Sequence, residues 1–312
     1  MKLRDLGEGE LIRKIRERFG PATAGLPVGI GDDAAVIDLP ARHSLVFCAD
    51  LIAENTHFIR DLHPPDAIAY KAIASNVSDV AAMGGIATHF LISLAAPGDL
   101  DWSWCEAFFN GVEAACRKFE VALAGGDSSS SETIFVDVSM IGHVPSGRAV
   151  RRAGAKVGDT IYVTGMLGSS ALGLELLKAG KTNDASTKRH LYPEVRYRVG
   201  AAVADKAHAM IDVSDGLSTD LTHILEESKV SARVYKNRVP IWPAAEMDHA
   251  LHGGEEYELI IVGNDLPQAI EGVSITAIGE IIESRTEHRA LLVDAGNESL
   301  LTPRGWQHFK NE

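Results

Sequence analysis

The chain has 312 residues, of which 46% are hydrophobic, and a formal net charge of −13. This length and apolar content predict two domains, each with its own core. A chain this acidic offers no positive field to a phosphate backbone, which argues against a nucleic acid as partner. Three cysteines without a CxxC pair predict reduced thiols and a cytoplasmic location. The longest apolar tract, residues 77–97, is interrupted by polar residues and glycines, so we expect no membrane span.

The first predicted elements are a helix, a glycine-rich turn and a strand. Residues 3–19 place their large apolar side chains on one helical face. Asp32 and Asp33 follow in the turn, and an apolar run at 45–49 ends at Asp50. If the strand folds back beside the turn, three carboxylates converge. Two such charges about 5 Å apart repel by roughly 3 kcal/mol at an effective dielectric near 20, so the cluster is either a solvated acidic loop or a metal site.

The next stretch predicts a buried helix. Asp66 is its expected cap and Met83 its last residue, followed by a glycine stop. Lys71, Ser75 and Asp79 lie four residues apart and form one polar stripe. Such a stripe is usually solvated, but its neighbours here are Ala, Ile, Val and Met. We therefore expect the helix to be buried on most sides, where the carboxylate of Asp79 needs a partner.

The rest of the first half predicts alternating strands and one amphipathic helix. Residues 121–124 indicate a short strand that ends in a turn at Gly125-Gly-Asp127, which repeats the opening order of apolar strand, glycine turn and aspartate. The other expected elements are strands at 89–96 and 133–144 and a helix at 102–119.

Pro145-Ser-Gly147 marks the predicted boundary between domains 1–147 and 148–312. The basic cluster that follows is either a solvated linker or a phosphate contact, for which arginine geometry is suited; it comprises Arg148, Arg151, Arg152 and Lys156. Beyond it strands and helices alternate, so the fold class is α/β (α+β). We expect strands at 160–164, 208–213, 259–262, 274–282 and 289–293, helices at 169–178, 194–206 and up to Ser228, and a polar loop at 181–189.

Two phosphate-binding motifs are matched only superficially. Gly29-Ile-Gly-Asp-Asp-Ala34 fits GxGxxA, but its aspartates would face the pyrophosphate. Gly180-Lys-Thr182 imitates the end of a P-loop, but Glu175 stands where that motif needs glycine. Aspartates recur instead at predicted strand ends beside small residues, which predicts Mg²⁺-dependent phosphoryl transfer. They are Asp33, Asp50, Asp79, Asp127, Asp212 and Asp215.

In order and spacing, the motifs resemble the thiamine-monophosphate kinase family, of the superfamily that includes aminoimidazole ribonucleotide synthetase. The resemblance covers almost the whole chain. It rests on Gly7-Glu-Gly-Glu-Leu-Ile12, Gly29-Ile-Gly-Asp-Asp33, residues 70–84, Gly125-Gly-Asp127, residues 154–159, Ile211-Asp-Val-Ser-Asp-Gly216, Gly253-Gly-Glu-Glu-Tyr-Glu258 and Gly305-Trp-Gln-His-Phe309. It implies a two-domain aminoimidazole ribonucleotide synthetase-like fold, with N-terminal domains that pair into a β-barrel in a homodimer and a C-terminal α/β sandwich.

The resemblance also implies that ATP and several Mg²⁺ ions serve the phosphorylation of thiamine monophosphate to thiamine diphosphate. It implies ATP, Mg²⁺ and dimer contacts in the N-terminal domain, and further nucleotide and substrate contacts in the C-terminal domain, without a catalytic acid or base. The implied metal residues are the six aspartates above, with Cys48 and Ala49 where the family usually has hydroxyl ligands. The implied ATP contacts are Phe109, Gly126, Asp127, Arg152 and Ser214, and the implied substrate contacts are His57, Glu255 and Trp306.

Cys48 and Ala49 keep other interpretations open. A thiol is a poor ligand for a hard cation, and alanine offers only its backbone. The chain is then either the kinase, a related ATP-dependent enzyme with another acceptor, or a nucleotide-binding homologue with impaired turnover.

Overall fold

The fold is that of a computed structural model, which describes residues 14–15, 17–19, 39–284 and 289–306. The chain divides into two compact units, Met1–Val80 with Ile86–Gly147, and Ala81–Gly85 with Arg148–Glu312. The predicted turn with Asp32 and Asp33 lies outside the described residues, and so does most of the predicted N-terminal helix, of which 14–15 and 17–19 are helical. Within the described ranges, no helix is both long and apolar enough to cross a membrane.

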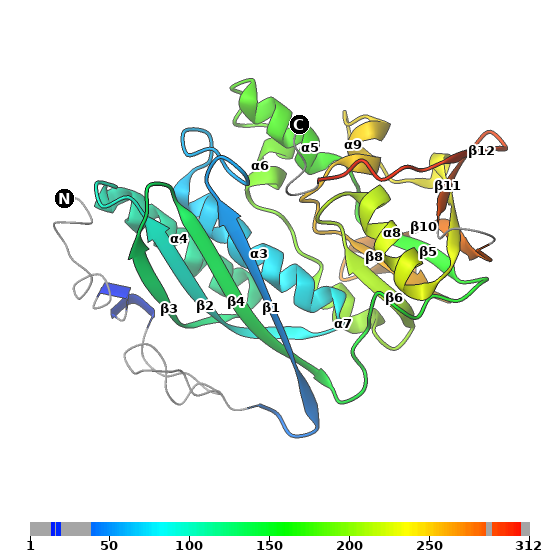
Figure 1. The fold of residues 1–312 in the computed structure, drawn as a ribbon, viewed down its shortest axis with the longest axis horizontal. Helices are drawn as coiled ribbons and strands as arrows, with labels where there is room; N and C mark the ends of the chain where they lie inside the picture. Colours follow the sequence, from blue (N-terminus) through cyan, green and yellow to red (C-terminus); the bar gives the residue numbers. More distant parts are fainter. Residues whose placement is uncertain (1–13, 16, 20–38, 285–288, 307–312) are drawn as a thin grey trace. The chain divides into compact units, whose positions relative to one another are not determined.

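The first unit contains a four-stranded mixed sheet in the order β1-β4-β2-β3. Strands β2 and β3 pair in parallel, and the other pairs are antiparallel. Helices α3 and α4 lie on one side of this sheet (Figure 1). The bounds are β1 His43–Ala53, α3 Pro65–Ala82, β2 Ile86–Ala96, α4 Trp102–Phe119, β3 Ala122–Ser130 and β4 Phe135–Pro145.

Helix α3 is buried around most of its circumference, as predicted. Its polar residues Lys71, Ser75, Asn76 and Ser78 are buried with its apolar ones. The helix begins at Pro65 rather than after a cap at Asp66. Proline suits the first helical position because its missing N–H has no partner there in any case.

The other side of this sheet is apolar and exposed. Along β4, Val136, Val138 and Met140 are buried, and the residues between them point the opposite way. These alternate residues of β4 and their cross-strand partners on β1 and β2 form the second side of the sheet. Several of their large side chains are solvent-exposed, and we call this surface the open face. Its exposed apolar residues are Leu45, Phe47, Leu51, Ile86, Leu91 and Phe135.

The predicted turn at Gly125-Gly-Asp127 is wrong, because these residues continue β3. They pair with β2 in parallel register, and Gly126 lies opposite Ile92. A Cβ atom at Gly126 would overlap the carbonyl oxygen of Ile92. Glycine is therefore needed here for close approach of two backbones and not for a turn.

The second unit is built on a larger mixed sheet in the order β12-β11-β7-β10-β5-β8-β6, with β9 paired to β10. The strands are β5 Thr160–Thr164, β6 Ala207–Asp212, β7 Ser231–Tyr235, β8 Leu259–Gly263, β9 Ala269–Ile270, β10 Val273–Ile282, β11 Ala290–Asp294 and β12 Asn297–Leu300. The helices are α5 Ser169–Lys178, α6 Ala185–Leu191, α7 Tyr197–Val203, α8 Leu217–Ser228, the 3-10 turn η1 Lys236–Arg238, and α9 Met247–His252.

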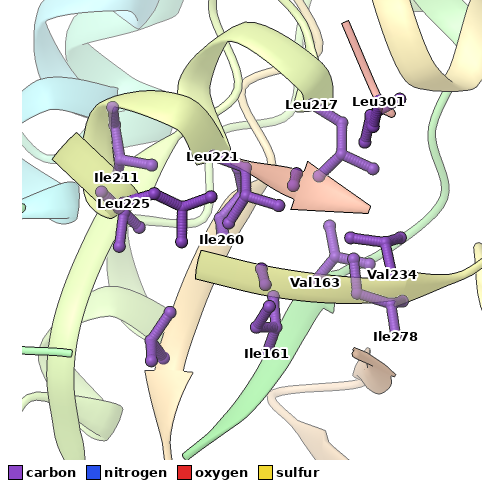
Figure 2. Close-up of a cluster of buried hydrophobic side chains, with 14 of the residues drawn as sticks. Ile161, Val163, Ile211, Leu217, Leu221, Leu225, Val234, Ile260, Ile278 and Leu301 are labelled. Atoms are coloured by element: carbon purple, nitrogen blue, oxygen red, sulfur yellow. The ribbon is translucent and has the colours of Figure 1, made fainter. Parts of the chain in front are cut away.

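Both faces of this sheet are buried at β8. Along β8, Ile260 belongs to a core with α8, and its neighbour Ile261 belongs to a second core with α7. Figure 2 shows Leu221 and Leu225 of α8 gathered with Ile260 in the first of these cores. A strand with two buried faces reads as a continuous apolar run, which is what residues 259–262 show.

The predicted polar loop at 181–189 is partly wrong, because α6 occupies residues from Ala185 onward. The Asp184 side chain caps this helix by accepting a hydrogen bond from the Ser186 N–H at 2.8 Å. The Thr187 hydroxyl is buried and donates to the Lys181 carbonyl at 2.8 Å. Polar side chains make the buried contacts of this helix, so its sequence shows no apolar residues at helical spacing.

Candidate active site

Three segments of the second unit meet at the end of β6. The strand ends at the buried Asp212, and the chain continues through Ser214 and Asp215 into α8. The Ser214 carbonyl accepts a hydrogen bond from the Glu255 N–H at 2.8 Å, and the Asp215 carbonyl accepts one from the Trp306 N–H at 3.1 Å. Residues predicted for metal, ATP and substrate are therefore adjacent here.

Two glycines allow this junction to form. A Cβ at Gly254 would lie 2.5 Å from the Ser214 carbonyl oxygen, and one at Gly305 would overlap the Asp215 carbonyl oxygen. Glycine is therefore needed in both motifs because another backbone segment passes too close to leave room for a side chain.

Asp215 also belongs to a cluster of three ionisable residues at the start of α8. Oxygen or nitrogen atoms of Asp215, Asp220 and His223 lie within 4.8 Å of one another. Asp220 is buried and accepts hydrogen bonds from the N–H groups of Asp215 and Gly216 at 3.1 and 2.9 Å. Burial raises the pKa of Asp220 well above its usual value, and the charges of Asp212 and Asp215 raise it further. Such a group favours a cation or a shared proton.

Sequence reasoning missed Asp220 and His223. The signal was their three-residue spacing, which puts them on one face of the helix that follows Asp215. It also missed Glu256 and Glu258, which stand in a motif where only Glu255 was assigned. Both carboxylates are buried, and alternation of acidic residues before an apolar strand was the available signal.

In the first unit, β1 and α3 bring Asp50 close to the polar stripe. Burial raises the pKa of the Asp50 carboxyl, whereas a hydrogen bond from Ser75 and the nearby His57 lower it. Asp79 lies one turn beyond Ser75 on α3 and is half-buried. Asp79 therefore lies on the same face of α3 as Ser75, the residue that donates a hydrogen bond to Asp50.

His57 has a defined tautomer. Its Nδ1 accepts a hydrogen bond from the Ala53 N–H at 3.1 Å, which leaves the proton of the neutral ring on Nε2. Cys48 is turned toward α3, with Sγ 3.6 Å from both the carbonyl oxygen and Oδ1 of Asn76. Ala49 is exposed and points to the open face.

Other predicted residues of the first unit are not gathered with Asp50. Asp127 is exposed on the edge strand β3, whereas Asp50 is on the opposite edge strand β1. Gly126 pairs with β2, as described above. Phe109 is buried on α4, with its ring 5.9 Å from that of Phe19. Asp33 lies outside the described residues.

Arg152 lies beside β6, because the carbonyl of the preceding Arg151 accepts a hydrogen bond from the Met210 N–H at 3.1 Å. The Arg152 carbonyl accepts a hydrogen bond at 3.0 Å from the hydroxyl of Ser228, the last residue of α8. The guanidinium is exposed.

Comparison with known proteins identifies both halves of the chain. Residues 31–144 match AIR synthase related protein, N-terminal domain, and residues 156–288 match AIR synthase related protein, C-terminal domain. The chain is 35% identical to thiamine-monophosphate kinase of Escherichia coli K12, covering 97% of this chain and 98% of that protein. It is 34% identical to thiamine-monophosphate kinase of Aquifex aeolicus, covering 99% and 100%.

Solved structures agree with these relatives. The crystal structure of thiamine-monophosphate kinase from Stenotrophomonas maltophilia has a TM-score of 0.80 and 31% identity, covering 93% of this chain and 96% of that one. AaThiL complexed with AMPPCP and TMP has a TM-score of 0.78 and 33% identity, covering 99% of both chains. The two units thus carry the two-domain AIR synthase related fold, and the chain belongs to the thiamine-monophosphate kinase family.

Proposed function

We propose that this protein transfers the γ-phosphate of ATP to thiamine monophosphate and releases thiamine diphosphate and ADP. The observation that carries the proposal is the junction in the second unit, where Ser214, Asp215, Glu255 and Trp306 are held together by backbone hydrogen bonds. Its full-length relatives are thiamine-monophosphate kinases, and AaThiL binds AMPPCP and TMP.

The junction offers suitable groups for a cationic substrate. The thiazolium ring of thiamine is positive, and the best aromatic face for a cation is tryptophan. The Trp306 side chain is 47% exposed and so is accessible to a ligand. In our proposal Trp306 and Glu255 bind the thiamine moiety, while the exposed Ser214 contacts ATP. His57 donates its Nε2–H to the substrate phosphate.

The remaining assignments give each unit a part in phosphoryl transfer. The first unit is proposed to bind ATP and to dimerise, and the second to contribute further nucleotide and substrate contacts. Because both reactants are anionic, the protein must mainly align them and neutralise their charge. The proposed ATP contacts beyond Ser214 are Phe109, Gly126, Asp127 and Arg152.

The donor set fits Mg²⁺, which prefers carboxylate oxygens and, when bound, neutralises charge on the phosphates. The desolvated carboxylate of Asp50 is suited to pairing with a cation, since burial disfavours its charge otherwise. Cys48 and Ala49 do not fit as side-chain ligands, because Sγ points toward Asn76 and the Ala49 methyl group has no donor. The proposed metal residues are Asp33, Asp50, Asp79, Asp127, Asp212 and Asp215.

We also propose a homodimer formed through the open face. Asp50 and Asp127 stand on opposite edges of the sheet, three strand spacings or about 14 Å apart. An ion with Mg–O distances of about 2.1 Å cannot bind both carboxylates of one chain. Pairing two apolar open faces into a β-barrel buries exposed Phe47 and Leu51 and supplies a second copy of each edge.

The decisive assay mixes ATP and thiamine monophosphate with the protein and follows thiamine diphosphate, with Mg²⁺ and with excess chelator. The proposal expects product only with Mg²⁺. Binding of ATP without product would favour the impaired homologue that Cys48 and Ala49 suggest. Product only with a different acceptor would favour a related enzyme of the superfamily.

A further inference from the structure

Glu255 lies on a backbone that needs support. Its φ is 59° and that of Tyr257 is 52°, a left-handed conformation that costs a non-glycine residue of order 1 kcal/mol or more. Hydrogen bonds on one side fasten the segment to the loop after β6. The Val213 carbonyl accepts from the N–H groups of Glu256 and Tyr257 at 3.1 and 2.9 Å, and the Val213 N–H donates to the Glu258 carbonyl at 2.7 Å.

The side chain of Glu256 fastens the same segment on its other side. It is 2% exposed and reaches the N-terminus of α5. Oε1 accepts from the N–H groups of Gly168 and Ser170 at 3.0 and 2.8 Å, and Oε2 accepts from the Ser169 hydroxyl at 2.6 Å. The helix has no cap from its own Gly168, so a carboxylate from a distant segment satisfies its first donors.

A buried histidine joins this support to the carboxylate of Glu255. His190 is 1% exposed, and its Nδ1 lies 2.9 Å from the Ser170 hydroxyl and 3.5 Å from Glu255 Oε2. Ser170 is therefore shared, since its N–H meets Glu256 and its hydroxyl meets His190. The Glu255 side chain remains 28% exposed, so a ligand has access to it.

We infer that Glu256, Ser170 and His190 are positioning residues that aim the Glu255 carboxylate at the acceptor substrate. This inference rests on the proposed function, which makes Glu255 a contact of thiamine monophosphate. Glu256 fixes the strained backbone, and the Ser170–His190 pair fixes the side-chain direction. These residues act through Glu255 and have no role in binding ATP.

The test is steady-state kinetics with thiamine monophosphate and ATP varied in turn. We expect E256A to raise KM for thiamine monophosphate about tenfold and to leave KM for ATP within about twofold. E256Q keeps an oxygen acceptor for the α5 N–H groups and should bring KM back to within about threefold of the unchanged protein. E175Q, which alters an exposed carboxylate on the same helix, is the matched control and should change neither KM.

A double-mutant cycle separates positioning from general destabilisation. If Glu256 acts through Glu255, the effects of E255Q and E256A on the acceptor KM are less than additive. Additive effects, an equal rise in both KM values, or unchanged kinetics in E256A would overturn the inference. Should E256A fail to fold, S170A carries the same comparison, because it removes the contact with His190 and keeps the N–H for Glu256.

The same data distinguish this inference from the proposed function. If E255Q raises the acceptor KM and E256A does not, positioning by Glu256 is refuted and the substrate assignment stands. If E255Q itself leaves the acceptor KM unchanged, or if the unaltered protein forms no thiamine diphosphate, the failure belongs to the proposed function.

Discussion

Replacing Glu258 by glutamine tests how much the second unit depends on one buried charge. The carboxylate is fully buried and accepts hydrogen bonds of 2.6 Å from Arg189 Nη2, from Arg196 Nε and Nη2, and from the Thr164 hydroxyl. Glutamine keeps the size but loses the charge and one acceptor. Among the described residues, the acidic partner that the two largely buried guanidinium groups then still share is Glu194.

The expected cost is large because the removed charge has buried partners. Removing one partner of a buried ion pair costs about 3–5 kcal/mol. For a unit of this size, each kcal/mol lowers Tm by roughly 2–4 °C, so Glu258→Gln should lower Tm by roughly 6–20 °C. Thermal unfolding followed by circular dichroism measures this shift.

Glu194→Gln is the matched control, because Glu194 contacts the same two arginines at 2.6 and 3.3 Å with a side chain that is 57% exposed. Solvent screens an exposed carboxylate, so the control should cost less than about 1 kcal/mol. The reasoning is refuted if Glu258→Gln unfolds within a few degrees of the unaltered protein, or if both variants lose the same stability.

Three further predictions concern the metal site, the dimer and pH. Asp79→Asn should lower kcat about 100-fold or more with unchanged Tm, because charge stabilisation worth several kcal/mol is lost; near-normal turnover across a magnesium titration would exclude the metal role. Phe47→Asp puts a charge on the open face and should give a folded monomer by light scattering, whereas a persistent dimer would place the interface elsewhere. Burial raises the pKa of Glu256 from 4.5 to about 7, so between these pH values the folded protein keeps a proton that the unfolded chain releases. The free energy of unfolding therefore falls as pH rises from 4.5 to about 7, by on the order of 3 kcal/mol at most. Urea unfolding should show a weaker pH slope in Glu256→Gln, and parallel slopes would contradict this.

The sequence predicted the elements whose apolar period is strong. The helix at 102–119 and the strand at 160–164 have the bounds that were expected. Such elements are specified by side chains that face one core, so their pattern is local.

The errors occur where a distant partner decides the structure. Gly125 and Gly126 are typical of a turn, but both continue β3, and the β2 backbone requires glycine at position 126. Helix α6 is buried through hydrogen bonds to Lys181 and Trp242, neither of which a local pattern reveals. For the same reason the family resemblance indicated Ser214, Asp215, Glu255 and Trp306 as site residues, but the local sequence did not indicate that the carboxylates of Glu256 and Glu258 are buried beside distant partners.

The assignment of Ala81–Gly85 to the second unit limits how the gene can be cut. Ala82 packs in a core with Val199 and Val203, and the Met83 carbonyl accepts a hydrogen bond from the Val150 N–H at 3.0 Å. A fragment that starts at Arg148 would lack these five residues and open a gap in that core. Recombination between homologous genes at the codon for Arg148 would likewise pack residues 81–85 of one parent against the second-unit core of the other.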